Sequence, residues 1–362
     1  MTIKKLKNLR NSIDAIDQDL YALIQKRASY AVDIGKLKSK LSPKDSYYKP
    51  DRESKILRNI LKANEKGLLP DSKIRIIFKE LISGCLSLEE VLKVAFLGPE
   101  GTHSESAVHN QFGSQVIRIP TSTIEDVFFQ TLNDEVNMGV VPVENSSEGV
   151  INTTLNCLAD NEDIKIIGEI YLDIEHQLAA GNKFNIKDAF AIASHPQALG
   201  QCSKWIERNI GNIKRLEMPS SAVAAQYAKE NKNILCIVNA MAIKNYKLKL
   251  IKENIQDYSE NKTRFLVIGK IDVEKTGRDK TSFLIQTPNK PGSLMSVLKP
   301  FDKRKINLSK IETRPSRGNT NSHDFFVDCE GHINDRKLSL VIKEVNETGA
   351  IIRNFGSYPE YI

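Results

Sequence analysis

The N-terminal segment carries an apolar stripe that one chain cannot bury by itself. The stripe recurs at spacings of three and four residues, at Leu6, Leu9, Ile13, Ile16, Leu20 and Leu23. Neither Gly nor Pro interrupts the run before Gly35, and this period predicts one long amphipathic helix that Pro43 ends at the latest. A bundle formed between two chains is the expected way to cover such a stripe.

Two shorter apolar-periodic runs follow, and they predict helices at Arg52–Ala63 and Ser72–Leu92. A Gly-Leu-Leu-Pro break separates them, and Asp71 or Ser72 is expected to cap the second helix. We therefore expect residues 1–92 to form an all-α domain.

Length and composition indicate a globular protein of two or three domains. The chain has 362 residues, of which 40% are apolar and 27% charged. The N-terminus lacks the apolar core of a signal peptide, and no stretch is long and apolar enough to span a membrane. The five cysteines and six histidines are scattered without disulfide or zinc spacing. We expect a cytoplasmic protein without metal, cofactor or membrane partner.

The net charge of +7 lies entirely in the helical segment, because residues 1–90 hold 19 Lys and Arg against 12 Asp and Glu. A basic arm on nucleic acid is one explanation. These charges alternate with acids on a helical pattern, however, and no aromatic stacking platform accompanies them. A basic pocket for a small polyanion explains the excess equally well, and we expect no nucleic-acid partner.

Three of the cations have informative positions on the first helix. Arg27 falls on the apolar stripe, and Lys38 returns to nearly the same face about 16 Å further along. Long side chains at these two positions can bracket a small anionic ligand. Arg10 lies about 26 Å before Arg27, so it can reach that ligand only from an antiparallel partner chain.

The central segment alternates short strands with helical stretches. The strands are expected at 94–97, 116–119, 139–143, 165–170, 190–193, 234–238 and 265–268. This order predicts an α/β domain with a mainly parallel sheet, which binds its ligands beyond the carboxyl ends of the strands. The polar stretches GPEGT and VENSSEG sit at two such ends.

The second of these stretches allows three interpretations: a helix cap, a glycosylation acceptor or a ligand site. Asn145 and Asn152 both head an Asn-x-Ser/Thr pattern, but without a secretion signal the glycosylation interpretation fails. Ser147 or Asn152 is expected to cap the following helix. Glu144, Asn145 and Ser146 are expected to surround a ligand.

The C-terminal segment, residues 280–362, predicts a ferredoxin-like α+β unit. Its order is strand (282–286), helix (292–305), strand (306–312), strand (322–329), helix (335–348) and strand (350–357). Residues 273–279 are expected to form the linker that precedes it.

The helical segment resembles the all-helical chorismate mutases over residues 1–92. The likeness rests on LRNSIDAIDQDLYALIQKRASYAVDIGKLK, KPDRES and CLSLEE. It implies an intertwined dimer that converts chorismate to prephenate by a Claisen rearrangement, which needs compact binding of a dianion and stabilised charge on the ether oxygen. By resemblance, the site comprises the partner chain's copy of Arg10 and residues Arg27, Lys38, Lys49, Arg52, Glu53, Cys85 and Glu89.

The roles that this resemblance implies are specific. Arg27, Lys38 and Arg52 would hold the two carboxylates and the ether oxygen, and Glu53 would bind the ring hydroxyl. Many relatives have Gln at the position of Glu89. Because a carboxylate would repel the developing charge, Glu89 is expected to work protonated, and mutase activity is expected to fall toward alkaline pH.

The central segment resembles prephenate dehydratase over about residues 94–272. The likeness rests on GPEGTHSESA, VPVENSSEGVINTTL, SHPQALGQC and NKTRFLVIG, which occur in this order. It implies a periplasmic-binding-protein-like type II fold, with two α/β lobes around a cleft where prephenate loses carbon dioxide and water to give phenylpyruvate. By resemblance, Thr263 assists departure of the hydroxyl, and the pocket donors are Thr102, Asn145, Ser146, Ser194 and Gln201.

Other residues of this segment have more than one expected role. Glu144 is either an acid or a structural acceptor, and Arg264 either anchors a carboxylate or is structural. His103 and His195 are expected in the pocket wall. Some relatives carry a Glu near Met218, so a catalytic acid at that point is in doubt here.

The C-terminal segment resembles the ACT domain through TSFLIQTPNKPGSL and INLSKIETRP. In that family the two motifs bind phenylalanine between paired domains, which implies feedback inhibition. One wall would be Asn289, Pro291, Gly292, Ser293 and Leu294, where backbone N–H groups at a helix start suit a carboxylate. The other wall would be Glu312, Thr313, Arg314 and Pro315.

Together these segments predict a bifunctional, allosteric homodimer or higher homo-oligomer with domains at 1–92, 93–272 and 280–362. Two alternatives stay open. One is a ligand sensor without activity, and the other is an enzyme with a single active site, for which Glu89 and Met218 are the grounds.

Overall fold

The computed structural model describes residues 2–41, 47–182, 184, 189–258, 260–315 and 322–362. It contains two compact units. The first comprises residues 1–49, 56–92 and 112–117, and the second comprises residues 50–55, 93–111 and 118–362. None of the described helices is long and apolar enough to cross a membrane.

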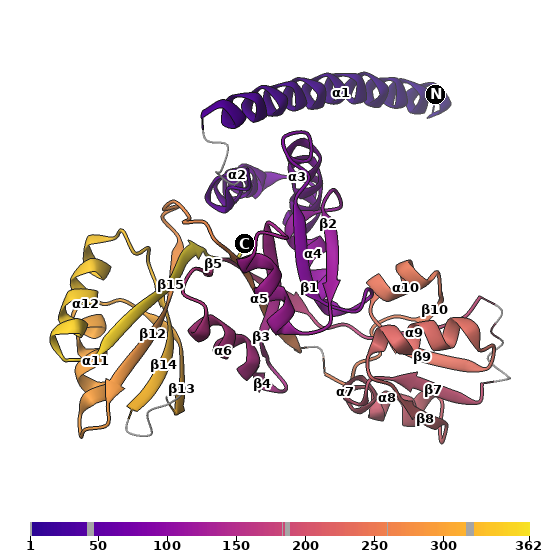
Figure 1. The fold of residues 1–362 in the computed structure, drawn as a ribbon. Coiled ribbons are helices and arrows are strands. Elements are labelled where there is room, and N and C mark those ends of the chain that lie inside the picture. Colours follow the sequence, from indigo (N-terminus) through magenta and orange to yellow (C-terminus); the bar gives the residue numbers. More distant parts are fainter. Residues whose placement is uncertain (1, 42–46, 183, 185–188, 259, 316–321) are drawn as a thin grey trace. The chain divides into compact units, whose positions relative to one another are not determined.

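The three predicted helices are present as α1 (Thr2–Leu41), α2 (Pro50–Ala63) and α3 (Asp71–Leu86) (Figure 1). A short 3₁₀ turn, η1 (Asn64–Lys66), follows α2. The apolar stripe of α1 is 49–63% exposed at the six predicted positions. The chain by itself therefore leaves the stripe uncovered, as the sequence analysis predicted. Pro43 lies outside the described residues.

Two details of α3 differ from the prediction. The helix ends at Leu86 rather than Leu92, where Ser87 donates a hydrogen bond from Oγ to the Gly84 carbonyl. The capping prediction was wrong, because Pro70 occupies the N-cap position and no side chain caps the helix. The Asp71 carboxylate instead accepts a hydrogen bond from Asn64 Nδ2 at 2.7 Å.

The first lobe of the second unit is built on a mixed sheet with the order β2-β1-β3-β11-β5, and β4 pairs with β3. β1 is parallel to β3, whereas β11 is antiparallel to both β3 and β5. The strands are β1 (Lys93–Leu97), β2 (Ile117–Thr121), β3 (Met138–Asn145), β4 (Gly149–Val150), β5 (Lys165–Asp173) and β11 (Lys262–Gly269). The helices are α4 (His103–Phe112), α5 (Ile124–Leu132) and α6 (Asn152–Asp160).

The second lobe has the sheet order β10-β6-β9-β7-β8, in which β7 is parallel to β8 and β9, and β6 is antiparallel to β9 and β10. The mainly parallel sheet was therefore wrong: two mixed sheets are present. The strands are β6 (Gln177–Ala180), β7 (Ala191–Ser194), β8 (Lys214–Glu217), β9 (Ile234–Val238) and β10 (Lys249–Lys252). The helices are α7 (Pro196–Gln201), α8 (Ser203–Asn209), α9 (Ser221–Glu230) and α10 (Ala240–Tyr246).

The C-terminal segment has the predicted order of two helices and four strands. Its antiparallel sheet runs β13-β14-β12-β15, the order of a ferredoxin-like unit. The elements are β12 (Asp279–Pro288), α11 (Ser293–Lys303), β13 (Leu308–Pro315), β14 (Ser322–Glu330), α12 (Arg336–Glu347) and β15 (Ile351–Pro359). Leu284, Phe326 and Tyr358 belong to one buried cluster with Ala95 and Leu266, so this sheet packs on the first lobe.

Candidate active sites

A cavity of about 290 Å³ lies between the two lobes of the second unit. It lies beyond the carboxyl ends of β1 and β3, where the sequence analysis placed GPEGT and VENSSEG. Six of the predicted residues line it: Thr102, Asn145, Gln201 and Thr263, and the two histidines expected in the pocket wall, His103 and His195. Its polar lining also includes His176, Ser220, Ser221 and Asn239.

Asn145 and Thr263 form a bonded pair in the cavity wall. β11 runs antiparallel to β3 with Thr263 opposite Asn145, so the start of one strand lies beside the end of the other. Asn145 Nδ2 donates to Thr263 Oγ1 at 2.7 Å, and each residue is only 7% exposed. Because the Thr263 oxygen accepts this bond, its own proton is left for a ligand.

The turn after β3 fixes the orientation of the Asn145 amide. The backbone N–H groups of Ser147 and Glu148 both donate to Asn145 Oδ1, at 2.9 and 3.2 Å. The amide nitrogen must therefore face Thr263. The turn residues predicted to cap α6 do not do so, since Ile151 is the N-cap and makes no side-chain cap. The polar stretch orients Asn145 instead.

Ser146 and Asn261 lie behind this pair. Ser146 Oγ accepts from the backbone N–H of Lys262 at 2.9 Å and donates to Asn261 Oδ1 at 3.2 Å. Asn145 Nδ2 also donates to Asn261 Oδ1 at 3.1 Å. Ser146 thus ties the turn to the start of β11 and does not line the cavity. Asn261 was not predicted, although it opens the quoted NKTRF motif.

The second lobe contributes a histidine that the sequence analysis missed. His176 Nε2 lies 2.7 Å from Gln201 Oε1, which accepts the bond and leaves the Gln201 amide nitrogen for the cavity. His103 packs edge-on against His176 with ring centroids 6.0 Å apart. Burial, and then the neighbouring His176, lower the pKa of His103 to about 3, and burial also lowers the pKa of His176. Both rings are neutral at physiological pH.

Ser194 does not line the cavity. Its hydroxyl is fully buried and donates to the Ile237 carbonyl at 2.6 Å, which joins β7 to β9. His195 does line it, and its Nδ1 accepts from the backbone N–H of Gln197 at the start of α7. Met218 packs in the apolar core of the second lobe, so no acid occupies that position. Asn239 caps α10 through Oδ1, and its buried Nδ2 has no partner among the described residues.

Thr102 sits in a turn that a buried carboxylate organises. Its Oγ1 donates to the Leu97 carbonyl at 3.2 Å. Glu105 is 3% exposed and accepts from the Gly101 backbone N–H at 2.6 Å and from Asn245 Nδ2 at 2.8 Å. Arg118 completes the contacts of Glu105 at 3.3 Å. Because Asn245 belongs to α10, this carboxylate links the two lobes beside the cavity.

Glu144 and Arg264 face away from the cavity. Arg264 is 5% exposed, and its guanidinium contacts Glu169 at 2.9 Å and Asp328 at 2.5 Å. Glu144 contacts Lys310 Nζ at 2.7 Å. Of the alternatives stated for each residue, the structure favours the structural role over contact with a ligand.

In the helical unit, Lys38 and Glu89 are brought together. Lys38 Nζ lies 3.0 Å from Glu89 Oε2, and Arg27 donates to the Leu81 carbonyl at 3.3 Å. Gly35 permits this approach, since a Cβ there would lie 3.3 Å from the Glu89 Cα. Lys38 thus contacts Glu89 as an ion pair, and the protonated Glu89 stays a prediction for the substrate complex.

The remaining predicted residues of this site have different environments. Arg10, Lys49 and Arg52 are exposed, whereas Glu53 and Cys85 are buried at 9% and 5% exposure. Arg10 lies on the same helix as Arg27, so within one chain its distance from that residue is fixed by the helix rise.

The predicted effector residues lie on the turn before α11 and on β13. Gly292 has φ = +83° at the N-cap of α11, a backbone conformation that glycine adopts readily. Asn289, Pro291, Leu294 and Thr313 are exposed, and Ser293 and Glu312 are half-buried. The side chain of Pro315 lies outside the described residues.

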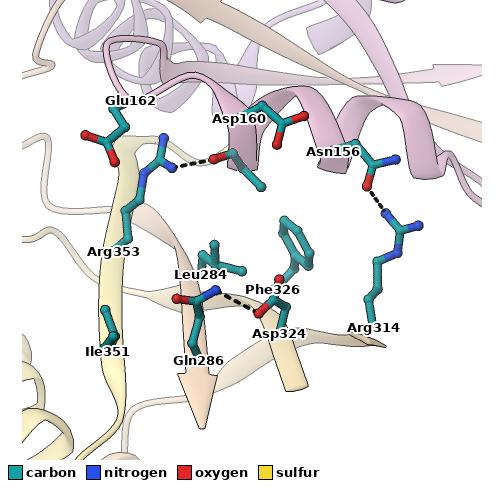
Figure 2. Close-up of a pocket in the computed structure, with 11 residues that line it drawn as sticks. Asn156, Asp160, Glu162, Leu284, Gln286, Arg314, Asp324, Phe326, Ile351 and Arg353 are labelled. Carbon is teal, nitrogen blue, oxygen red and sulfur yellow. Dashed lines mark hydrogen bonds between the residues drawn. The ribbon is translucent and has the colours of Figure 1, made fainter. Parts of the chain in front are cut away.

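A second cavity, of about 360 Å³, lies between α6 and the C-terminal sheet (Figure 2). Arg314 donates across it to Asn156 Oδ1 at 2.6 Å, and Arg353 donates to the Ala159 carbonyl at 2.6 Å. On its floor, Gln286 donates to Asp324 at 2.9 Å. These arginines are engaged in joining the two segments. Arg314 contacts α6 rather than the turn before α11.

Comparisons with known proteins match both catalytic segments. The Chorismate mutase type II family matches residues 9–90, and the Prephenate dehydratase family matches residues 94–272. A bifunctional chorismate mutase/prephenate dehydratase of Stutzerimonas stutzeri is 40% identical over 361 residues, covering 99% of this chain and 98% of that protein. The Aquifex aeolicus protein of the same name is 40% identical and covers 99% of both.

Among solved structures, the prephenate dehydratase of Arthrobacter aurescens in complex with L-Phe superposes with a TM-score of 0.68 at 29% identity. It covers 74% of this chain and 90% of that one. These likenesses favour the enzyme over the ligand-sensor alternative. The chain belongs to the bifunctional chorismate mutase/prephenate dehydratase family, and it is both an isomerase and a lyase.

Proposed function

We propose that residues 1–92 rearrange chorismate to prephenate, that residues 93–272 convert prephenate to phenylpyruvate, and that residues 280–362 form an ACT domain through which phenylalanine inhibits. The observation that carries the dehydratase assignment is the Asn145–Thr263 pair in the wall of the cavity between the lobes. The two-lobed architecture supports a periplasmic-binding-protein-like type II fold. The cytoplasmic location stays a prediction.

In the dehydratase reaction, the electron pair of the bond to the ring carboxylate enters the ring as carbon dioxide leaves. The ring hydroxyl departs at the same time, and a proton converts it to water. Thr263 can donate a hydrogen bond to that departing oxygen, because Asn145 occupies its acceptor side. The Gln201 amide and the buried Asn239 amide nitrogen are further donors for the carboxylate that stays.

The neutral lining of the cavity suits this reaction. Its polar residues are amides, hydroxyls and histidines, and burial lowers the pKa of His103 and of His176 so that both rings are neutral. A cation against the ring carboxylate would stabilise the charge that must be lost as carbon dioxide. Hydrogen-bond donors hold the substrate without that penalty.

In the mutase reaction, Arg27, Lys38 and Arg52 would bind the two carboxylates and the ether oxygen of chorismate. Glu53 would bind the hydroxyl, and the Arg10 of a second copy would complete the site. The exposed stripe of α1 supports such a dimer, because apolar side chains about half exposed along a 40-residue helix favour association. Lys38 would turn from Glu89 to the substrate.

The C-terminal segment would bind phenylalanine between paired ACT domains, at the turn Asn289–Leu294 and the strand residues Glu312–Pro315. Its βαββαβ order and ferredoxin-like sheet support the assignment. The relative from Arthrobacter aurescens, solved with L-Phe, adds to it.

One experiment tests both activities and the inhibition. Purified chain is supplied with chorismate, and prephenate and phenylpyruvate are followed over time with and without L-phenylalanine. The proposal expects prephenate to appear and be consumed, phenylpyruvate to accumulate, and phenylalanine to slow the second step.

If prephenate accumulates and no phenylpyruvate forms, the mutase alone is active. Met218 is the ground for that alternative. Phenylpyruvate formed from added prephenate but not from chorismate would leave the dehydratase alone, the alternative for which Glu89 is the ground. No effect of phenylalanine would refute the regulatory assignment.

A further inference from the structure

Two neighbouring rungs of the β3–β11 ladder face opposite sides of the first sheet. Thr263 is opposite Asn145, and Arg264 is opposite Glu144. Successive side chains on a strand point to opposite faces, so the first pair, the cleft rung, faces the cavity, and the second pair, the outer rung, faces away from it.

One half of the outer rung is held by the C-terminal sheet through a buried ion pair. Arg264 donates from Nη1 to Asp328 on β14 at 2.5 Å and from Nη2 to the hydroxyl of Tyr358 on β15 at 3.0 Å. Its Nε donates to Glu169 on β5 at 3.0 Å. Asp328 in turn accepts from Ser282 Oγ at 2.6 Å. A guanidinium this deeply buried keeps its carboxylate partners, since losing one leaves an uncompensated charge.

The other half is held by the neighbouring strand of the same sheet. Lys310 Nζ on β13 lies 2.7 Å from Glu144 Oε2, and the Lys310 side chain is 14% exposed. Arg314, four residues later on β13, donates to Asn156 Oδ1 of α6 (Figure 2). β13 therefore contacts the first lobe at the strand that ends in Asn145 and at the helix that follows the turn.

We propose that Arg264 and Glu144 are positioning residues of the dehydratase reaction. Asp328 holds Arg264 and Lys310 holds Glu144, and we call these two contacts the clamp. By holding the outer rung, the clamp fixes the position of the Thr263 hydroxyl on the cleft rung. The inference rests on the proposed role of Thr263. Each clamped residue is joined to a cleft-rung residue by one peptide bond, so a displacement of the C-terminal sheet moves the donor itself. Misplacing a reacting group by about 1 Å is enough to lower a rate substantially. A ligand that shifts β13 would act on Thr263 by this route.

The test uses the full-length chain with Asp328→Asn and Lys310→Met, each of which removes one charge of the clamp without touching the cavity. The matched controls are Glu344→Gln and Lys303→Met, which remove an ion pair between α11 and α12 inside the C-terminal segment. Dehydratase kcat and KM for prephenate, mutase rate and thermal unfolding are measured for each protein.

We expect Asp328→Asn to lower dehydratase kcat about 10-fold and Lys310→Met about threefold, with KM changed less than about twofold and the mutase rate unchanged. The two controls should keep the wild-type rates. If Asp328→Asn does not fold, Lys310→Met carries the test. Folded clamp variants with wild-type kcat would overturn the proposal.

A second background separates positioning from a general structural effect. In Thr263→Ala, the clamp substitutions should cause no further loss, because the donor that they position is gone. If the clamp substitutions lower dehydratase kcat by the same factor in the wild type and in Thr263→Ala, the clamp does not act through Thr263. If Thr263→Ala itself keeps the wild-type rate, the proposed function of Thr263 fails; if Thr263→Ala is inactive and the clamp variants are active, the clamp alone fails.

Discussion

The helical segment and the cavity between the lobes meet substrates that each carry two carboxylates, yet they offer different side chains. The helical segment supplies cations, with Arg27 and Lys38 on α1. The cavity is lined by amides, hydroxyls and imidazoles. A rearrangement that builds charge on an ether oxygen gains from cations, whereas a reaction that discards a carboxylate as carbon dioxide is slowed by binding that charge tightly. With the two reactions assigned as proposed, the fate of the substrate's carboxylate explains why one site is cationic and the other is not.

The two sites also differ in what one chain can complete. The cavity has its Asn145–Thr263 pair in place and donors from both lobes of the same chain. The helical segment leaves its stripe about half exposed, and Arg10 is held far from Arg27 by the helix itself. We therefore expect mutase activity, and not dehydratase chemistry, to depend on association of two chains.

The largest expected effect is on the cavity. Thr263→Ala should lower dehydratase kcat about 100- to 1000-fold, the range for removing one donor to developing negative charge on oxygen. The mutase rate of the same protein should not change. Thr263→Ser, which keeps the hydroxyl, should recover most of the rate in a steady-state assay with prephenate. A loss below threefold for the alanine variant would remove Thr263 from the reaction.

The helical site can be tested by mixing two inactive variants. Arg10→Ala and Arg27→Ala should each lose mutase activity, but a mixed dimer has one site with both arginines intact. Equal mixing after dissociation and reassociation should restore about a quarter of the wild-type rate, since half of the dimers are mixed and each has one good site. Dehydratase activity, measured in parallel, should stay constant. Absence of recovery in dimers confirmed by mass would place Arg10 outside the site.

Much of this arrangement was predictable from the sequence, because periodicity and motif order are local. The long helix, the order of the C-terminal elements and the placement of Asn145 at a strand end were confirmed. The direction of β11 was not predicted, since pairing between Thr263 and Asn145 spans 118 residues and no local signal records it. In the predicted parallel sheet, the start of β11 would lie at the opposite edge from the end of β3, so Thr263 would have been far from Asn145.

The roles of individual side chains were harder to predict. Ser194, expected in the pocket, is buried at the end of β7, where its hydroxyl donates to β9, and Arg264 contacts a carboxylate 64 residues away. Neither contact leaves a pattern in the neighbouring sequence. His176 was missed because it lies in no quoted motif. Its bond to Gln201 depends on the fold of the second lobe.

The lowered pKa of His103 in the cavity wall should also make the free energy of unfolding depend on pH. The pKa of His103 is lowered to about 3 in the folded chain, against about 6.5 when unfolded. Below pH 6.5 the unfolded chain therefore binds a proton that the folded chain does not, so stability falls as pH drops toward 3. His103→Asn lacks this dependence. The difference in unfolding free energy between the variant and the wild type should therefore shift by about 2 kcal/mol in favour of the variant when the pH is lowered from 7.5 to 5.

Chemical unfolding checks this expectation. The unfolding of the dehydratase segment is followed for both proteins at both pH values. The comparison is between the two pH values rather than between the two proteins, because Asn also changes packing against His176. If the unfolding free energies of the two proteins differ by the same amount at both pH values, the pKa of His103 is not lowered in the folded chain.

The smallest expected effect concerns Glu89, a carboxylate among the cations of the proposed mutase site. Glu89 lies 3.0 Å from Lys38 in the structure, so it competes with substrate for that ammonium, and as an anion it would repel charge on the ether oxygen. Glu89→Gln keeps the shape and the hydrogen bond but removes the charge. We expect the two proteins to have mutase rates within about threefold at pH 5 and the variant to be several-fold faster at pH 9, where the wild-type rate has fallen. Parallel profiles from pH 5 to 9 would show that the Lys38–Glu89 pair does not limit the reaction. In that case the contrast between the cationic helical site and the uncharged cavity between the lobes would depend on the arginines of the helical site and not on Lys38.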